Sequence, residues 1–362
     1  MDSAQKRALI AVAILIVLLA LVGVYAFHSF RSRRAAPAPG PSVSVIVTPA
    51  HTSDVLSLLP SGAPVLAFAD VSTLRASPFA ADLQALEPAP DEDKDYRDFV
   101  RETGFDYSRD LDRFALDAWI DANKRLPNGS PRISLITVAD GKFDRAKISA
   151  YALRSGGKAT KHGDIDVYEV PSNLPGEKLT FAFLSPTRIA LAQGANLDPV
   201  LAKDGSASLD SATRERIARV GGSTIFAVAQ TNDLAKIVAI PGIESGQLNR
   251  ILSSIRGLAL DGRPDGNKLV AAVQADCDSL TNALQLSALL DTLRWLGRAA
   301  LADPKTRAQM KPDDADALDT LLKISHVSRD GRAVRVRAEI PANILKAPAP
   351  APAARKTPKP LR

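Results

Sequence analysis

Cysteine, histidine and aromatic residues are scarce in this chain. Among 362 residues there are one cysteine, four histidines and 5% aromatic residues. The single cysteine, Cys277, excludes an internal disulfide, and its setting before an expected helix indicates a packed or partly buried thiol. The histidines form no motif with metal-ligand spacing such as H-E-x-x-H; they are His28, His51, His162 and His326. We therefore predict no metal site and no other cofactor.

Motifs that carry catalysis are missing as well. The sequence has no G-x-S-x-G and no G-x-x-x-x-G-K-[ST]. Two carboxylate pairs, Asp110/Asp112 and Asp164/Asp166, have the alternate spacing that places side chains on one face of a strand, so a carboxylate-based hydrolase is one alternative. Asp is also common in turns and helix caps. We predict no catalytic residue and a protein that is not an enzyme.

A net positive charge is missing from the part of the chain that is expected to fold. The formal net charge is +6, but residues 1–42 carry +4 and residues 346–362 carry +5, so residues 43–345 carry −3. A nucleic-acid-binding domain needs its basic charge on a folded face. The distribution predicts no nucleic-acid partner.

A stretch of 20 residues without a charge, Ala8–Phe27, dominates the N-terminus. As a helix it would be about 30 Å long, the thickness of the hydrocarbon core of a bilayer. A cleaved signal peptide is the alternative, with Val24-Tyr25-Ala26 as a small-x-small site, but its apolar region is typically about 7–15 residues. We predict an uncleaved transmembrane helix that binds the lipid bilayer through residues 8–27.

The orientation is predicted from the short N-terminal tail. Two basic residues precede the apolar stretch and three follow it, so the positive-inside rule does not decide. A short tail before the span and a Pro-rich spacer after it are typical of a signal-anchor. We expect a single-pass protein of the inner membrane with most of the chain in the periplasm.

Composition divides the rest of the chain into segments. Pro-rich residues after the span would hold the following domain away from the membrane, and the C-terminal Ala/Pro-rich basic tail cannot build a core. The expected segments are an N-terminal tail (1–7), the transmembrane helix (8–27), a linker and lead-in (28–57), a first α+β unit (58–205), a second α+β unit (206–346) and a disordered basic tail (347–362).

The expected fold class is α+β, with antiparallel sheets backed by helices. The apolar run at 63–71 predicts a buried strand, and helical patterns follow at 72–86 and 91–103. Further along, the patterns predict a β-hairpin over 117–139, a helix over 142–155, strands at 165–170 and within 179–192, a short helix at 196–201, helices at 248–255 and 313–324, and a final hairpin that turns at Asp330-Gly331.

The pattern of the first unit then begins again. Ser223–Ala229 matches the strand at 63–71, Leu258-Ala-Leu-Asp261 echoes Phe114-Ala-Leu-Asp117, and Ala275-Asp276 follows a strand as Ala139-Asp140 does. We interpret this as an internal duplication. The recurrent acids, Asp117 with Asp261 and Asp140 with Asp276, are expected to act at strand exits and helix caps.

A resemblance points the same way. The order PVLAFADVSTLRASPF, GFDYSRDLDRFAL, ITVADGKFD and DVYEV…FAFLSPTRIALAQG resembles uncharacterised bacterial envelope proteins of the acidobacterial type, over about residues 58–345. The resemblance implies a membrane-anchored envelope protein with a duplicated α+β domain. It implies no activity and no functional residue.

These observations together predict a non-enzymatic binding or scaffolding module whose partner is an envelope protein or ligand. An extracytoplasmic binder of an apolar or lipid-like ligand, held between the two units, is an alternative. A leucine-rich helix follows Asp276, with a stripe that predicts a core-facing side or a partner groove; its leucines are Leu286, Leu289, Leu290, Leu293 and Leu296.

Overall fold

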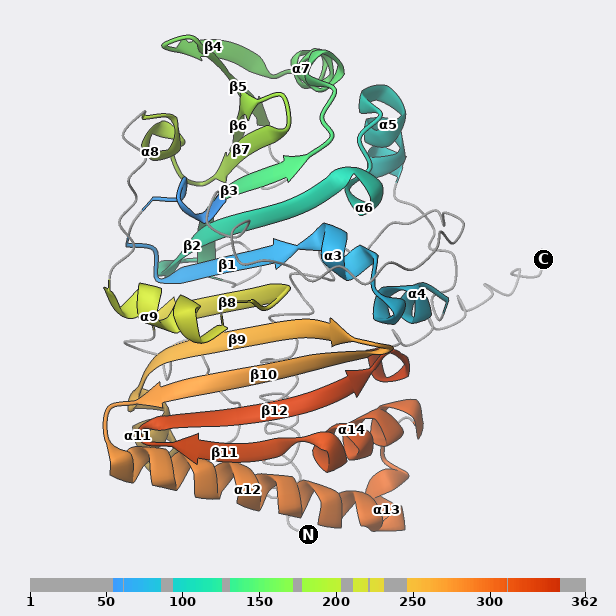
Figure 1. Cartoon of the computed structure of the whole chain (residues 1–362), viewed down its shortest axis with the longest axis vertical. Helices are drawn as coiled ribbons and strands as arrows, with labels where there is room; N and C mark the ends of the chain where they lie inside the picture. The colour runs from blue at the N-terminus through green and yellow to red at the C-terminus, as the bar shows by residue number, and fades with distance from the viewer. Residues whose placement is uncertain are drawn as a thin grey trace, which may run out of the picture.

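The structure is a computed structural model of the chain (Figure 1). It describes residues 55–60, 62–85, 94–125, 131–171, 178–202, 211–220, 222–230, 246–310 and 312–345. The expected transmembrane helix, Pro-rich linker and basic tail lie outside the described residues. Within the described part, no helix combines the length and apolarity needed to cross a membrane.

One antiparallel sheet of 12 strands runs through the molecule, with the order β11-β12-β10-β9-β8-β1-β2-β3-β7-β6-β5-β4 (Figure 1). This confirms the α+β class. The strands are β1 (Val65–Asp70), β2 (Leu111–Arg125), β3 (Pro131–Gly141), β4 (Lys158–His162), β5 (Ile165–Pro171), β6 (Lys178–Ser185), β7 (Arg188–Gln193), β8 (Ile225–Gln230), β9 (Ile255–Asp265), β10 (Lys268–Cys277), β11 (His326–Asp330) and β12 (Ala333–Pro341).

Helices pack on both faces of this sheet. They are α3 (Val71–Arg75), α4 (Pro78–Ala85), α5 (Lys94–Thr103), α6 (Tyr107–Asp110), α7 (Arg145–Arg154), α8 (Asp198–Leu201), α9 (Ser211–Val220), α11 (Gly246–Ser253), α12 (Leu280–Ala302), α13 (Pro304–Arg307), α14 (Pro312–Ile324) and the 3-10 turn η2 (Ala342–Leu345). Residues 55–59, α8 and α9 supply side chains to the core on one face, which we call face A. On the opposite face, face B, α7 packs on one end of the sheet and α11 and α12 pack on the other.

The strands on either side of the middle of the sheet pair directly. In β1 and β8, Ala67 lies opposite Ala227, with Leu66 opposite Val228 and Phe68 opposite Phe226. The Phe68 and Phe226 rings stack with their centroids 5.3 Å apart. The two expected units are therefore joined by backbone hydrogen bonds, and a ligand between them would have to lie on a face of the sheet.

Several expected elements begin or end elsewhere. The helix expected at 72–86 is two helices, α3 and α4, because Pro78 lacks the N–H that a continuous helix requires and Ser77 caps the second one through the amide of Ala80 at 3.2 Å. Strand β4 and helix α9 were not predicted. Every residue of β4 is exposed, so this strand has no apolar alternation by which the sequence could reveal it.

The helix starts after the two recurrent acids were also placed too early. Asp140 lies within β3 and Asp276 within β10. The residues that cap the following helices are Asp144, whose carboxylate accepts from the amide of Lys147, and Ser279, whose hydroxyl accepts from the amide of Asn282. The expected role of Asp140 and Asp276 as helix caps is wrong.

Candidate functional site

Asp117 and Asp261 lie on face A at corresponding points of the sheet. Asp117 in β2 is opposite Leu66 of β1, and Asp261 in β9 is opposite Phe226 of β8. Directly opposite residues of antiparallel strands share a face. Three strand spacings of about 4.8 Å separate β2 from β9, and the two acids are also offset by two residues along the strands, so they lie roughly 16 Å apart. Both lie in strand interiors, where the sequence had suggested strand exits.

Asp117 is a fully buried carboxyl group in the interior of β2. Its exposed fraction is 0%, and neither carboxylate oxygen has a hydrogen-bond partner among the described residues. Burial raises the pKa of Asp117 to about 7. The residues directly opposite it, Leu66 and Ile136, are apolar core residues. A charged carboxylate is costly in such surroundings, so the protonated form is favoured.

Asp261 has the basic partner that Asp117 lacks. The Nη2 atom of Arg335, from β12, donates to its two carboxylate oxygens at 2.9 and 3.2 Å. Burial still raises the pKa of Asp261, although the positive charge of Arg335 opposes the rise. The two recurrent acids therefore occupy similar backbone positions with different electrostatics.

Asp140 is held between two arginines of neighbouring strands. Arg113 of β2 donates from Nε at 2.7 Å, and Arg188 of β7 donates from Nε at 2.6 Å and from Nη2 at 2.9 Å. Burial raises the pKa of Asp140, but the hydrogen bonds from Arg188 and Arg113 outweigh it and hold the pKa below its usual range. This is a cross-strand ion-pair network on face A.

The arginines that pair with Asp276 come from a helix, whereas those that pair with Asp140 come from strands. Arg219 of α9 approaches its carboxylate at 2.9 Å and Arg216 at 3.6 Å. Gly257 lies opposite Asp276 in β9, and a Cβ atom on that glycine would come within 2.4 Å of the Arg216 guanidinium. The missing side chain at Gly257 makes the space that Arg216 fills.

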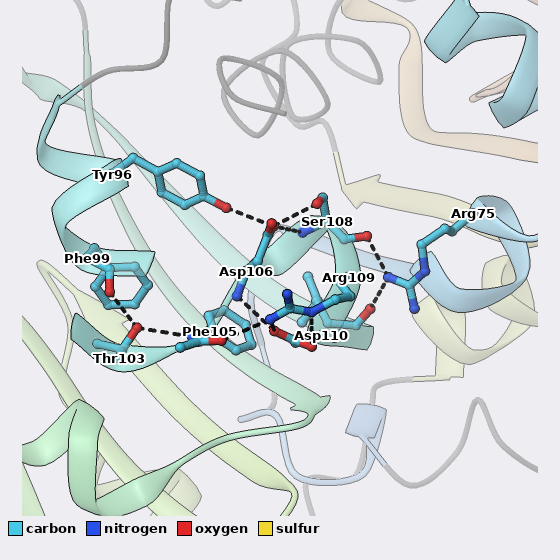
Figure 2. Close-up of polar contacts among 11 residues, drawn as sticks. Arg75, Tyr96, Phe99, Thr103, Phe105, Asp106, Ser108, Arg109 and Asp110 are labelled. Carbon is cyan, nitrogen blue, oxygen red and sulfur yellow. Dashed lines mark hydrogen bonds and ion pairs between the residues drawn. The ribbon is translucent and has the colours of Figure 1, made fainter. Parts of the chain in front are cut away.

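A polar network joins α3, α5 and α6 at one corner of the first half (Figure 2). Asp106 caps α6 through the amide of Ser108 and accepts from the hydroxyl of Tyr96 at 3.0 Å. Asp110 accepts from two nitrogens of Arg109, and Arg75 donates to the carbonyl oxygens of Ser108 and Leu111. Tyr96 and Arg75 connect α6 and the first residue of β2 to α5 and α3, so the network fixes the start of β2.

Three of the four acids in the carboxylate pairs that favoured a hydrolase are engaged in ion pairs. Asp110 binds Arg109, Asp112 lies 3.7 Å from Arg75, and Asp166 lies 3.3 Å from Lys161. These contacts are those of structural ion pairs. In the described part of the chain, no group of three or more His, Cys, Asp or Glu residues is arranged to hold a metal ion.

Cys277 is packed as the sequence predicted. It is 4% exposed and belongs to the core between β10 and helices α11 and α12. Burial raises the pKa of the thiol, and the nearby negative charge of Asp278 adds to the rise. A buried thiol with a raised pKa is a poor nucleophile, so its role is packing.

The outer side of α12 is a feature that the leucine pattern did not reveal. Leu286 is buried, with Leu289 and Leu290 packed beside it, so this part of the stripe faces the core as expected. Leu296, however, is 43% exposed. Among the described residues, six large hydrophobic side chains are exposed, and four of them belong to α12: Leu280, Leu284, Trp295 and Leu296.

The fold and these contacts define an α+β protein built on one 12-stranded antiparallel sheet, with buried ion-pair networks and one exposed apolar helix face. No protein-family model and no curated protein sequence matches the chain. Among solved structures, the chain is similar to crystal forms I, III and IV of TP0453, with TM-scores of 0.45, 0.44 and 0.44 and 12% identity in each case. Each alignment covers 81% of this chain and 95%, 96% and 95% of the respective TP0453 chains.

Proposed function

We propose that this chain is a single-pass envelope protein of the inner membrane, anchored by residues 8–27, whose periplasmic α+β body is a non-enzymatic binding or scaffolding module. The observation that carries the proposal is the charge-free stretch Ala8–Phe27. The exposed apolar residues of α12 support a binding role, because contiguous apolar patches on a protein surface often mark interaction sites.

Membrane extraction tests the anchor. We expect the full chain to remain with the membranes after alkaline carbonate treatment and to be released by detergent. The matched variant carries Leu15→Arg and Leu18→Arg, which place two charges in mid-span at a cost of about 3 kcal/mol each. This variant is expected in the soluble fraction. Full-length wild-type chain in the carbonate supernatant would contradict the proposal, and so would a purified chain that lacks residues 1–26.

Reporter fusions test the orientation. A reporter that is active only in the periplasm, fused after Arg362, is expected to give a signal, and one that is active only in the cytoplasm is expected to be silent. The reverse pattern would place the α+β body in the cytoplasm.

We also infer that the body arose by duplication of one α+β unit. Three strands of each half support this: β1, β2 and β3 pair in the same order as β8, β9 and β10. The registers agree as well, since Asp117 is opposite Ile136 and Asp261 is opposite Ala272, which fits the sequence correspondence of residues 132–138 with 268–274. Gly62 and Gly222, which precede β1 and β8, have φ values of 85° and 88°.

A further inference from the structure

Helix α12 presents a row of exposed apolar side chains on its outer side, interrupted by the exposed Asp291. Leu280 and Leu284 are 59% and 57% exposed, and Trp295 is 67% exposed. The spacings of 4 and 11 residues are about one and three helical turns, so the three side chains lie along one line. Ala288 and Ala299 are exposed on the same line. We call these residues, together with Leu296, the outer face of α12.

The core holds this face outward. Ala283 and Leu286 are buried against β10 and β12, and Gly297 is so close to α14 that a Cβ atom there would lie 2.9 Å from Leu322. The helix therefore has a fixed rotation about its axis. Its 23 residues extend about 34 Å along one end of the sheet (Figure 1), and the outer face cannot turn inward without loss of these contacts.

We propose that the outer face of α12 lies on the surface of the bilayer, with its leucines and Trp295 in the headgroup and upper acyl region. Trp is typical of this interface because its ring is apolar and its N–H is polar. The charge is also suitable: residues 280–307 carry +2, whereas residues 43–345 as a whole carry −3. A basic element with an apolar face fits an anionic lipid surface, since burial of the apolar side chains and attraction to the lipid charge both favour adsorption.

This inference rests on the proposed anchor. With one point of each chain held in the bilayer, adsorption of α12 becomes an intramolecular step at high effective concentration, so a short apolar row is sufficient. The linker of 28–54 would reach at most about 90 Å when fully extended, which leaves the body free to lie down on the membrane or to stand away from it.

Fluorescence of Trp295 in the full chain distinguishes these two arrangements. The chain has two tryptophans, so Trp119→Phe leaves Trp295 as the only one. The protein is reconstituted in vesicles of phosphatidylcholine and phosphatidylglycerol whose acyl chains are brominated. We expect strong quenching of Trp295 and a blue shift of its emission. Trp119 packs partly buried against the face A core, and in the matched variant Trp295→Phe it is expected to keep its emission.

Substitution of the leucines supplies the second measurement. In the Trp119→Phe background, Leu280→Glu with Leu284→Glu is expected to abolish the quenching, because the charges oppose insertion. The control is Leu153→Glu, since Leu153 is 48% exposed but lies on α7; quenching is expected to persist. Circular dichroism confirms that each variant is folded.

The outcomes separate the two proposals. Vesicles that float with the chain while Trp295 stays unquenched would overturn the contact of α12 and leave the anchor intact. Chain that does not float with the vesicles would overturn the anchor itself. Unquenched Trp295 with an emission shift that depends on protein concentration would assign the face to a second copy of the chain and would also overturn the lipid contact.

Discussion

Asp117 and Asp261 occupy matching positions on face A, yet in the part of the chain that the structure describes only Asp261 has a basic partner. Asp117 has no hydrogen-bond partner among the described residues, whereas Arg335 donates to Asp261. The difference follows from the strand two places away in the sheet: Arg335 of β12 lies opposite Gln274 of β10, whereas the corresponding residue of β7, Ala190, lies opposite Val138 of β3 and carries no charge. One half of the sheet therefore has a buried acid that an arginine partly compensates, and the other has a buried acid with no hydrogen-bond partner among the described residues.

The buried Asp117 should make stability fall as pH rises. Its pKa of about 7 in the folded protein lies above the usual value of about 4 in the unfolded chain. The folded state therefore binds the proton more tightly, and its advantage is complete below about pH 4 and lost as pH rises through about 7. The loss is at most about 4 kcal/mol by about pH 8. In Asp117→Asn, urea titrations from pH 5 to pH 8 should show a much flatter dependence.

Asp261→Asn is the matched control for this prediction. It removes the partner of Arg335, so we expect it to destabilise the protein at pH 8, whereas Asp117→Asn should leave the stability at this pH unchanged or raise it. If both variants change the free energy of unfolding with the same sign at pH 8, the electrostatic contrast between the two acids is wrong.

Asp140 should contribute stability with the opposite pH dependence. Its pKa is held below the usual range, so its contribution is present above the unfolded value of about 4 and is lost as pH falls through the lower folded value. Asp140→Asn leaves Arg113 and Arg188 without their carboxylate, and we expect a loss of roughly 3–5 kcal/mol at pH 7. Urea titrations at pH 7 and pH 3 measure this: the difference from wild type should shrink at pH 3.

Gly257 should be less tolerant of alanine than another glycine of the same strand. A Cβ atom at Gly257 would displace the guanidinium of Arg216 and weaken its contact with Asp276, at a cost of about 1 kcal/mol. At Gly262 the same atom would meet its neighbours at 3.7 and 4.0 Å, which is ordinary contact. We expect thermal unfolding to show a lower midpoint for Gly257→Ala and no decrease for Gly262→Ala. Equal decreases in both variants would contradict this role of Gly257.

Local pattern was sufficient to predict much of the fold. The hairpin at Asp330-Gly331 and the strands on either side of Ser185-Pro186-Thr187 were predicted because turn residues interrupt clear apolar runs. The continuous sheet was not predicted, because the pairing of β1 with β8 joins residues about 160 positions apart. Nothing local in either strand specifies that partner.

The same limit applies to the buried charges. The recurrence of Asp117 and Asp261 identified positions of interest, but their partners come from other strands and helices, such as Arg335 of β12 for Asp261. Helix caps were misplaced by four residues at Asp140 because a later aspartate, Asp144, also fits the cap pattern. The exposed side of α12 could not be identified from the sequence, because its leucines occupy more than one face of the helix.

The stacked pair Phe68–Phe226 should couple the two halves into one cooperative unit. The rings lie on β1 and β8, the strands that join the halves. We expect Phe68→Ala and Phe226→Ala each to cost roughly 3–5 kcal/mol, with a coupling of about 0.5–1.5 kcal/mol in the double-mutant cycle.

The tryptophans report this cooperativity because Trp119 lies in β2 of the first half and Trp295 lies in α12 of the second. In the variants that keep one tryptophan each, urea unfolding should give the same midpoint, and Phe226→Ala should lower both midpoints equally. The control pair is Tyr168 and Phe181, whose rings stack at 5.0 Å within the first half. If Phe226→Ala changes the midpoint reported by Trp295 but not the midpoint reported by Trp119, the halves unfold separately and the pairing of β1 with β8 does not couple them.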